Sequence, residues 1–212
     1  ANPEESYPEF LRRLQVLLPR LDAMGRNYYD PLQKITSVTD KNSDLKVILS
    51  APLPEQKLQY RWGPQQAWMD YTEALFVERS ATLEARFASE NAADTAVFKQ
   101  NFLIHEGIQA KVRINKKPHP SYNSGGVMAL NNGVVGSRDR YGDKEWLGFS
   151  GDDVKITIDL DTLTPINSIK MRFHNGNGQW IYAPKNVNIL FDDEKKHQFE
   201  IKNDSLLVNF KA

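Results

Sequence analysis

The sequence predicts a mainly β protein in which an N-terminal helix is followed by two antiparallel β-sandwiches. Three observations support this fold class. Residues 1–40 begin with apolar side chains at helical spacing, whereas residues 41–107 consist of short alternating segments separated by turn residues. Residues 108–212 contain a further set of alternating segments. We therefore divide the chain into a helical region, 1–40, and two β-rich modules, 41–107 and 108–212.

The composition limits the classes of partner. A chain of 212 residues with 40% hydrophobic side chains is long enough to bury a core. Its 27 basic and 27 acidic residues give a formal net charge of zero, which provides no attraction for nucleic acid or an anionic membrane. No apolar run reaches the roughly 20 residues that cross a bilayer, and cysteine is absent. We expect no nucleic-acid partner, no membrane insertion and no disulfide.

The first helix is predicted to begin at Ser6, because Ser6-Tyr7-Pro8-Glu9 has the form of a capping box. Gly25 is placed to end the helix in the left-handed conformation. Pro19 interrupts the pattern, and an interior proline costs about 3 kcal/mol of helix stability. We therefore expect a kink near Leu18 or a break into two shorter helices. The abrupt opening at Ala1, without a signal-peptide pattern, suits a fragment of a longer protein.

Eleven strands are predicted from alternation and from β-branched or aromatic residues. In the first module they are 45–50, 57–62, 75–77, 82–88 and 95–104; in the second they are 109–114, 154–160, 166–173, 187–191, 197–201 and 206–210. The clearest is 154–160, where Val154, Ile156, Ile158 and Leu160 should form a half-buried apolar face.

The tryptophans are assigned by context. Trp146 precedes a predicted buried strand and should lie in the core. Trp62 and Trp68 flank a turn and should pack against the helix or the other module. Trp180 has two interpretations, packing under the second sandwich or exposure in a loop.

Residues 122–160 carry glycine, aromatic and acidic residues at defined spacing. These are Gly125, Gly126, Ala129, Leu130, Gly133, Gly136, Ser137, Trp146, Gly148, Phe149, Gly151, Asp153, Asp159 and Leu160. Together with the W-I-x-x-P segment that begins at Trp180, they resemble the C-terminal discoidin-like (coagulation-factor type C) module of bacterial family 20 glycoside hydrolases, the β-N-acetylhexosaminidases. In that family the module continues into a strand with an Arg-Tyr element. This chain ends before it, so the sandwich is either truncated or lacks its last strand.

Two further segments resemble the same enzymes. The motif Thr82-Leu83-Glu84-Ala85-Arg86 is similar to one in the chitobiase-type, fibronectin-III-like module that follows the catalytic barrel. The helical region is similar to the helix that follows the last barrel strand, through Phe10, Arg13, Leu14, Leu17, Leu21, Gly25 and Tyr28. The resemblance thus implies a terminal barrel helix, a fibronectin-III-like sandwich and a discoidin-like jelly roll.

The resemblance also implies a non-catalytic role. In the family, the Asp-Glu pair that hydrolyses terminal N-acetylhexosamines lies on the barrel, before the region matched here. The catalytic barrel of the parent chain is then the expected partner. The expected location is the periplasm, the cell surface or outside the cell. The acidic clusters Asp152-Asp153 and Asp192-Asp193-Glu194 fit turns rather than a catalytic pair. We expect no catalytic residue in this chain.

A metal or cofactor is not expected. The histidines His105, His119, His174 and His197 lack the spacing of a zinc helix. Many discoidin-like modules hold a structural calcium ion through an Asp-Gly loop, but the neutral Asn132 stands at that position here.

Carbohydrate binding is the remaining function to consider. Sugars are bound by aromatic rings and by polar side chains that hydrogen-bond their hydroxyls, commonly in loops. The candidates are Arg138, Arg140, Tyr141 and Asp143 in one loop and His174, Asn175, Asn177, Gln179 and Trp180 in another. N-acetylhexosamine- or galactose-containing glycans are the ligands that the resemblance implies. The alternatives are a solvated loop or an interface with the barrel. A purely structural or protein-interaction module is the competing function, and exposure of Leu14, Leu17 and Leu21 would favour it.

Overall fold

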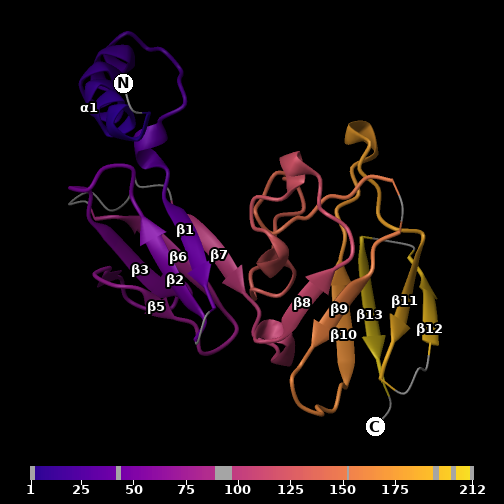
Figure 1. Cartoon of the computed structure of the whole chain (residues 1–212). Coiled ribbons are helices and arrows are strands. Elements are labelled where there is room, and N and C mark those ends of the chain that lie inside the picture. Colours follow the sequence, from indigo (N-terminus) through magenta and orange to yellow (C-terminus); the bar gives the residue numbers. More distant parts are fainter. Residues whose placement is uncertain are drawn as a thin grey trace. The chain divides into compact units, whose positions relative to one another are not determined.

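The computed structural model describes residues 3–41, 44–88, 97–151, 153–192, 196–201 and 204–210 (Figure 1). The chain forms two compact units: unit 1 comprises 1–109 and 131–135, and unit 2 comprises 110–130 and 136–212. The predicted mainly β class with one N-terminal helix is confirmed, because α1 precedes a series of antiparallel sheets. The arrangement of these sheets as two sandwiches stays a prediction. The described residues also form five short 3-10 helices: η1 (Pro31–Gln33), η2 (Glu106–Ile108), η3 (Pro120–Tyr122), η4 (Val127–Leu130) and η5 (Asn177–Gln179). Among the described helices, none combines the length and the apolar character that a bilayer span requires.

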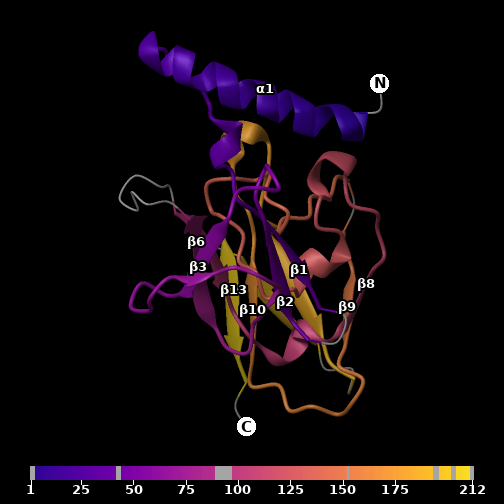
Figure 2. The ribbon, with the colours of Figure 1, turned by 90° about the vertical axis from the view of Figure 1, so that its left-hand side faces the viewer.

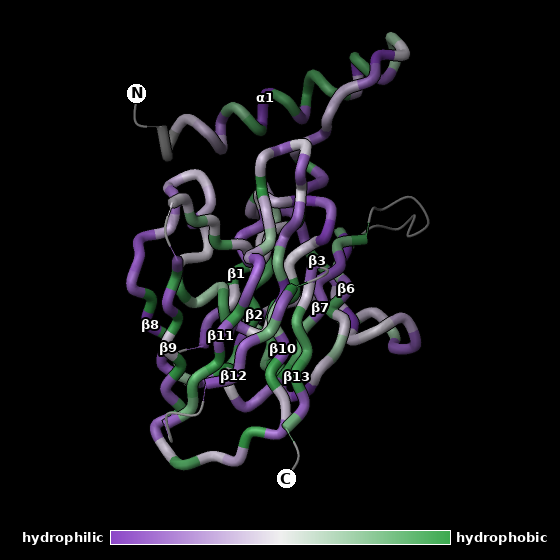
Figure 3. The backbone as a smooth tube through the Cα atoms, turned by 90° about the vertical axis from the view of Figure 1, so that its right-hand side faces the viewer, coloured by the Kyte–Doolittle hydropathy of each residue, from purple (hydrophilic) through white to green (hydrophobic). Residues whose placement is uncertain are grey.

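Helix α1 (Pro3–Ala23) begins three residues before Ser6, so the prediction that Ser6 caps the start of the helix is wrong. The helix also runs through Pro19 without a break (Figure 2). Proline removes a donor to the carbonyl of Gln15, but both residues are exposed, so water can reach that carbonyl. Hydrophobic and hydrophilic residues alternate along α1 (Figure 3). Its buried Leu11 and Leu18 pack with Leu32 and Leu53, which supplies the tertiary support that a helix in water needs.

The C-terminus of α1 follows the prediction. Gly25 has φ +63°, a conformation that glycine adopts without steric cost. The N–H of Arg26 donates to the carbonyl of Leu21 at 3.0 Å, and the N–H of Gly25 donates to that of Asp22 at 2.9 Å. These two bonds form a Schellman motif, which satisfies carbonyls that the helix leaves unpaired.

Unit 1 contains two antiparallel sheets. The three-stranded sheet has the order β1 (Thr36–Asp40), β2 (Lys46–Ser50), β5 (Leu75–Phe76); the four-stranded sheet has the order β4 (Met69–Asp70), β3 (Leu58–Trp62), β6 (Ala81–Phe87), β7 (Phe98–Phe102). Strands β2, β3, β5 and β7 lie within predicted segments, and β6 begins one residue before the predicted 82–88. Strands β1 and β4 were not predicted. Val47 and Leu49 of one sheet and Leu83 and Phe87 of the other belong to a single buried cluster. This cluster is the hydrophobic core of unit 1.

Residues 131–135 belong to unit 1 although the flanking chain belongs to unit 2. Val134 bridges Phe102 in antiparallel register, and the N–H of Leu103 donates to the carbonyl of Gly133 at 2.7 Å. The buried amide of Asn131 accepts from Lys41 Nζ at 2.7 Å and donates to the carbonyl of Gly107 at 2.7 Å. Residues 131–135 therefore continue the antiparallel pairing at the end of β7, on the side of unit 1.

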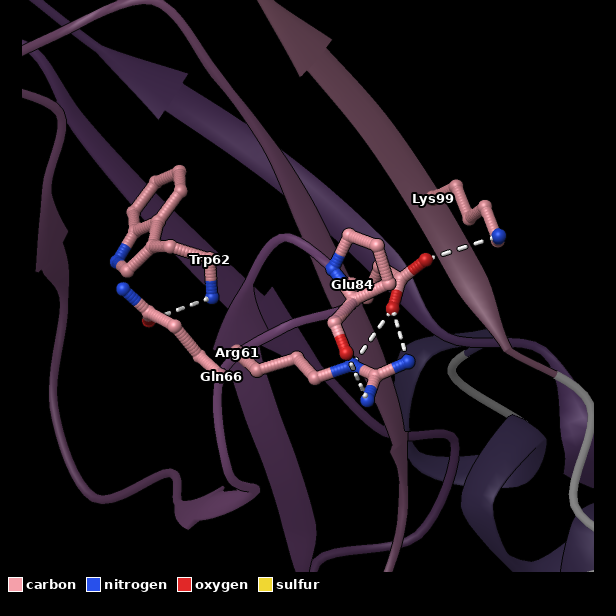
Figure 4. Close-up of polar contacts among 6 residues, drawn as sticks. Arg61, Trp62, Gln66, Glu84 and Lys99 are labelled. Carbon is pink, nitrogen blue, oxygen red and sulfur yellow. Dashed lines mark hydrogen bonds and ion pairs between the residues drawn. The ribbon is translucent and has the colours of Figure 1, made fainter.

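The face of the four-stranded sheet that points away from the core is polar. Glu84 on β6 lies directly opposite Arg61 on β3 and Lys99 on β7. Both cations contact its carboxylate (Figure 4). The turn after β3 is held by a bond from Arg61 Nη1 to the carbonyl of Pro64 at 3.1 Å. Alternation thus places one buried carboxylate on the face opposite the core.

Unit 2 consists of three two-stranded antiparallel sheets among its described residues: β8 (Lys111–Ile114) with β9 (Ile156–Asp159), β10 (Ser168–Arg172) with β13 (Ser205–Asn209), and β11 (Asn186–Leu190) with β12 (Lys196–Glu200). All six lie at predicted strands. Ile158 is 58% exposed, so the predicted burial of its face is wrong at that position. The reason is that a two-stranded ribbon buries a face only where another layer covers it.

Candidate functional site

Five aromatic side chains from three separate segments of unit 2 form what we call the ring cluster: His119, Tyr122, Tyr141, Trp146 and His174. The ring centroids are 5.6 Å apart for His119–Tyr122, 6.1 Å for Tyr122–Tyr141, 5.9 Å for Tyr141–His174 and 5.6 Å for Trp146–His174. Such distances and tilted geometries are those of attractive aromatic pairs. The cluster brings together Tyr141 and His174, which belong to the two loops singled out in the sequence.

Two glycines of the motif let these segments approach. A Cβ atom at Gly148 would lie 2.7 Å from Cβ of Tyr122, and the N–H of Gly148 donates to the carbonyl of Tyr122 at 3.0 Å. A Cβ atom at Gly136 would lie 3.0 Å from Nε1 of Trp146. Any larger residue at either position would displace a ring. The spacing of the motif glycines therefore has a steric origin in the cluster.

Trp146 is half-buried rather than in the core. Its indole N–H donates to the carbonyl of Ser137 at 3.0 Å. The guanidinium of Arg172 lies 5.4 Å from its ring and donates to the carbonyl of Gly136 at 2.9 Å. A cation over an indole face is an attractive arrangement. Trp146 and Arg172 thus fix the base of the loop that carries Tyr141.

Asp143 organises this loop. One of its carboxylate oxygens accepts from the N–H of Ser137 at 2.9 Å, and the other lies 3.2 Å from Nε of Arg140. Arg138 pairs with Asp204 at 3.6 Å. Because both oxygens of Asp143 are engaged, its role is to position the loop, while the largely exposed guanidinium of Arg140 can contact a ligand.

The second loop is closed by backbone bonds. Gly176 and Ile181 exchange two hydrogen bonds, of 2.9 and 3.2 Å. A Cβ atom built on Gly176 would lie 2.5 Å from Oε1 of Gln179 and 3.3 Å from Nε2 of His174. These two polar side chains therefore converge over the glycine, at the edge of the ring cluster.

Trp180 is at the tip of this loop and is 83% exposed, which decides between its two interpretations. Its φ of +60° is left-handed, a conformation that costs a non-glycine residue about 1–2 kcal/mol. Strain of this kind persists where the surrounding structure imposes it, and the Gly176–Ile181 bridge does so here. Asn175 and Asn177 are exposed and make no side-chain hydrogen bond among the described residues.

Glu145 is a residue of this site that the sequence did not single out. It is half-buried beside Asp143 and Trp146. Burial raises the pKa of its carboxyl group, and the charge of Asp143 acts in the same direction. In the sequence it is one acid in the charged run that begins at Ser137, and nothing local distinguishes it from its solvated neighbours.

The tryptophans of unit 1 do not pack as predicted. Trp62 packs on the core of its own unit, with its ring 6.0 Å from that of Phe102. The ring of Trp68 contacts the guanidinium groups of both Arg61 and Arg86, whose central carbons lie 4.4 and 4.3 Å from the ring centroid. The paired strands β3 and β6 carry both arginines, so the sheet itself provides the partners that were assigned to the helix or the other module.

Unit 1 has a hollow of about 340 Å³, a volume within the range of small-ligand pockets. It lies beside the chain that connects β4 to β5. Its lining residues are Tyr60, Trp62, Asp70, Thr72, Glu73, Ala74, Leu75, Phe76 and Glu78. Three of them are acidic and none is basic, so the lining carries a negative charge.

The acidic clusters and the turn at Asn132 are the remaining features singled out in the sequence. Asp153 is exposed, and Asp152, Asp193 and Glu194 lie outside the described residues. Asn132 accepts a hydrogen bond from the N–H of Val134 at 3.0 Å and thereby caps its own turn. In the described part of the chain, no three His, Cys, Asp or Glu side chains are grouped to hold a metal ion. The residues at this turn do not fit a carboxylate-bound calcium site.

Together these features define a mainly β protein with an N-terminal helix, two compact units and an aromatic and polar cluster in the loops of one unit. No protein-family model matches the chain, and no curated protein matches it.

Proposed function

We propose that this chain is the non-catalytic C-terminal accessory region of a β-N-acetylhexosaminidase and that the loops of unit 2 bind glycans. Unit 1 is then a fibronectin-III-like sandwich and unit 2 a discoidin-like jelly roll. The sequence motifs support the family. The exposed ring of Trp180, in the same loop as the converging side chains of His174 and Gln179, supports the glycan site. Of these, the geometry of Trp180 carries the binding proposal.

The site has the chemistry that a sugar needs. The indole of Trp180 offers a broad apolar surface to the C–H face of a pyranose ring. His174 and Gln179 offer a ring nitrogen and an amide to sugar hydroxyls. Tyr141 is partly exposed and extends the aromatic surface through the ring cluster. Ring packing holds Tyr141 and His174 in place, and backbone bonds fix the loop that carries Trp180, so less conformational entropy is lost on binding.

The ligands that follow from this proposal are N-acetylhexosamine- or galactose-containing glycans. The parent enzyme would act in the periplasm, at the cell surface or outside the cell, where such glycans occur. The catalytic barrel of the parent chain would be the physical partner of this region. The chain itself would catalyse no hydrolysis.

The glycan site is tested by calorimetric titration with N-acetylglucosamine and galactose oligosaccharides. Trp180→Ala and Tyr141→Ala should each weaken binding by about tenfold or more, which corresponds to ~1.4 kcal/mol. Tyr29→Ala is the matched control, because Tyr29 is an exposed aromatic residue of unit 1. The absence of heat at millimolar oligosaccharide, or equal binding by all three variants, would reject glycan binding by unit 2.

A second candidate, protein interaction through α1, is favoured by a different observation. Leu14 and Leu21 are half-buried against the cluster of Leu11 and Leu18, but Leu17 is 44% exposed. Further large apolar side chains are exposed as well: Tyr7, Phe10 and Val16 of α1, and Met24 directly after it. An apolar helix face of this kind is typical of a surface that packs on a partner.

For this candidate the partner is the catalytic barrel of the parent enzyme. Phe10→Ala combined with Leu17→Ala should weaken association with a separately produced barrel, whereas the exposed Arg12→Ala should not. Glycan binding in addition to barrel association would favour the first function, whereas barrel association without glycan binding would favour the second.

A further inference from the structure

The hollow of unit 1 combines two kinds of lining that point to one class of ligand. Rings contribute one part of it, through Tyr60, Trp62 and Phe76, and carboxylates contribute another. Rings attract cations through their faces, and carboxylates attract them through charge and hydrogen bonds. A lining of this composition, without a basic residue, favours a cationic ligand that also has an apolar face.

Two of the three rings of the hollow, Trp62 and Tyr60, are fixed by packing before any ligand arrives. Trp62 packs edge-to-face on Phe102, and Tyr60 packs edge-to-face on Tyr71 at 6.4 Å. Tyr71 in turn accepts a hydrogen bond from the N–H of Leu49 at 3.0 Å. The aromatic side of the hollow is therefore preorganised, which lowers the entropy lost on binding.

The carboxylates differ in their availability. Asp70 accepts a hydrogen bond from Gln59 at 3.0 Å. Glu73 and Glu78 are exposed, and neither forms an ion pair or a side-chain hydrogen bond with the described residues. These two acids can therefore turn toward a ligand without breaking an existing contact.

The chain already shows the same recognition at the margin of the hollow. The ammonium group of Lys46 on β2 lies 4.6 Å from the centroid of Phe76. One lining ring thus holds a primary ammonium group that belongs to the protein. The other two rings, Tyr60 and Trp62, have no such cation among the described residues.

We infer that this hollow binds a sugar that carries a free primary ammonium group, a 2-amino-2-deoxyhexose of the glucosamine class. The apolar face of its ring would pack on Trp62 and Tyr60, and its ammonium group would lie between Glu73 and Glu78. Thr72 and the carboxylates would accept its hydroxyl protons. This site is in unit 1 and is independent of the glycan site proposed for unit 2.

The probe is D-glucosamine at millimolar concentration, added to the intact chain and followed by amide chemical-shift changes. N-acetylglucosamine is the matched neutral probe, because it has the same ring without the charge. D-glucosamine should shift the signals of residues 69–78, and N-acetylglucosamine should bind there at least about tenfold more weakly. Added salt should weaken the binding of D-glucosamine, because an exposed charge pair is screened.

Glu73→Gln combined with Glu78→Gln should abolish the shifts caused by D-glucosamine. Glu55→Gln combined with Glu106→Gln is the matched control, since it removes the same charge from exposed residues outside the hollow and should leave the shifts unchanged. An absence of shifts in residues 69–78, equal binding of the two sugars, or equal binding by the two variants would overturn the inference. Trp180→Ala should leave D-glucosamine binding intact, so failure here is distinguishable from failure of the glycan site in unit 2.

Discussion

Arg61 and Glu84 form an ion pair across the neighbouring strands β3 and β6, with Nη2 of Arg61 2.6 Å from Oε2 of Glu84 and only 3% of the Glu84 side chain exposed. Lys99 of the other neighbouring strand approaches Oε1 at 2.9 Å. The guanidinium of Arg61 also stacks on Trp68. A buried carboxylate is thus satisfied by two cations that the register of the sheet places on either side of it.

Replacement of Glu84 by Gln should destabilise unit 1 by about 3 kcal/mol, because removing one partner of a buried ion pair leaves the other without compensation. This loss of stability lies at the lower end of the range for buried ion pairs, because Lys99 is largely exposed and water can solvate it. Urea denaturation at neutral pH, followed by the amide signals of β3 and β6, measures the change. Glu106→Gln, at an exposed position of the same unit, should stay within about 0.5 kcal/mol of the parent.

The same carboxylate should make stability depend on acidic pH. The hydrogen bond from Lys99 lowers the pKa of Glu84 below its ordinary 4.5, burial opposes this, and Arg61 lowers it further. A group whose pKa is lower in the folded state stabilises the protein above its unfolded-state pKa, and this stabilisation is lost as pH falls through the folded-state value. The difference in unfolding free energy between the parent and Glu84→Gln should therefore be constant near neutrality and shrink below about pH 4.5. A difference that grew on acidification would contradict the ion pair.

Gly125→Ala should destabilise unit 2 by about 2 kcal/mol through overpacking. A Cβ atom there would lie 2.1 Å from the carbonyl oxygen of Lys144 and 3.0 Å from Cβ of Ala129, so backbone has to move. At Gly142 nothing lies within 4 Å of such an atom, and Gly142→Ala should be close to neutral. Thermal unfolding followed at β10 and β13 compares the two. Equal destabilisation by the two substitutions would show that close packing does not explain why position 125 requires glycine.

Asn131→Ala should destabilise unit 1, although Asn131 lies beyond residue 109 in the sequence. The substitution removes the bonds to Lys41 and to the carbonyl of Gly107, which are both partly buried, and should cost about 2 kcal/mol. Amide exchange at Leu103 should become faster, because its N–H donates to Gly133 in the same segment. The exposed Asn177→Ala is the control. Unchanged exchange at Leu103 would show that residues 131–135 do not stabilise unit 1.

Local features were accessible from the sequence. The alternation at 166–173 and 206–210 located β10 and β13, because side chains on successive strand residues point to opposite faces whatever the fold. Gly25 marked the end of α1, because the left-handed conformation favours glycine. The start of α1 was misplaced, since a capping box inside a longer helix has the same sequence as one at its start.

The candidate site was only partly accessible. The loops that carry Tyr141 and His174 could be named from their composition, but the 5.9 Å contact between them joins residues 33 positions apart. The positioning role of Asp143 and the half-burial of Glu145 depend on how one loop folds back on itself. Single-residue chemistry does not encode such contacts.

By itself, the sequence determined the mainly β class, the positions of most strands and the end of the first helix, because these follow from periodicity and from the backbone preferences of single residues. Only the tertiary structure decided that β1 pairs with β2, that residues 131–135 join unit 1 and that Glu84 is buried between two cations. Each of these outcomes depends on contacts between residues distant in the chain, where packing and burial outweigh local propensity.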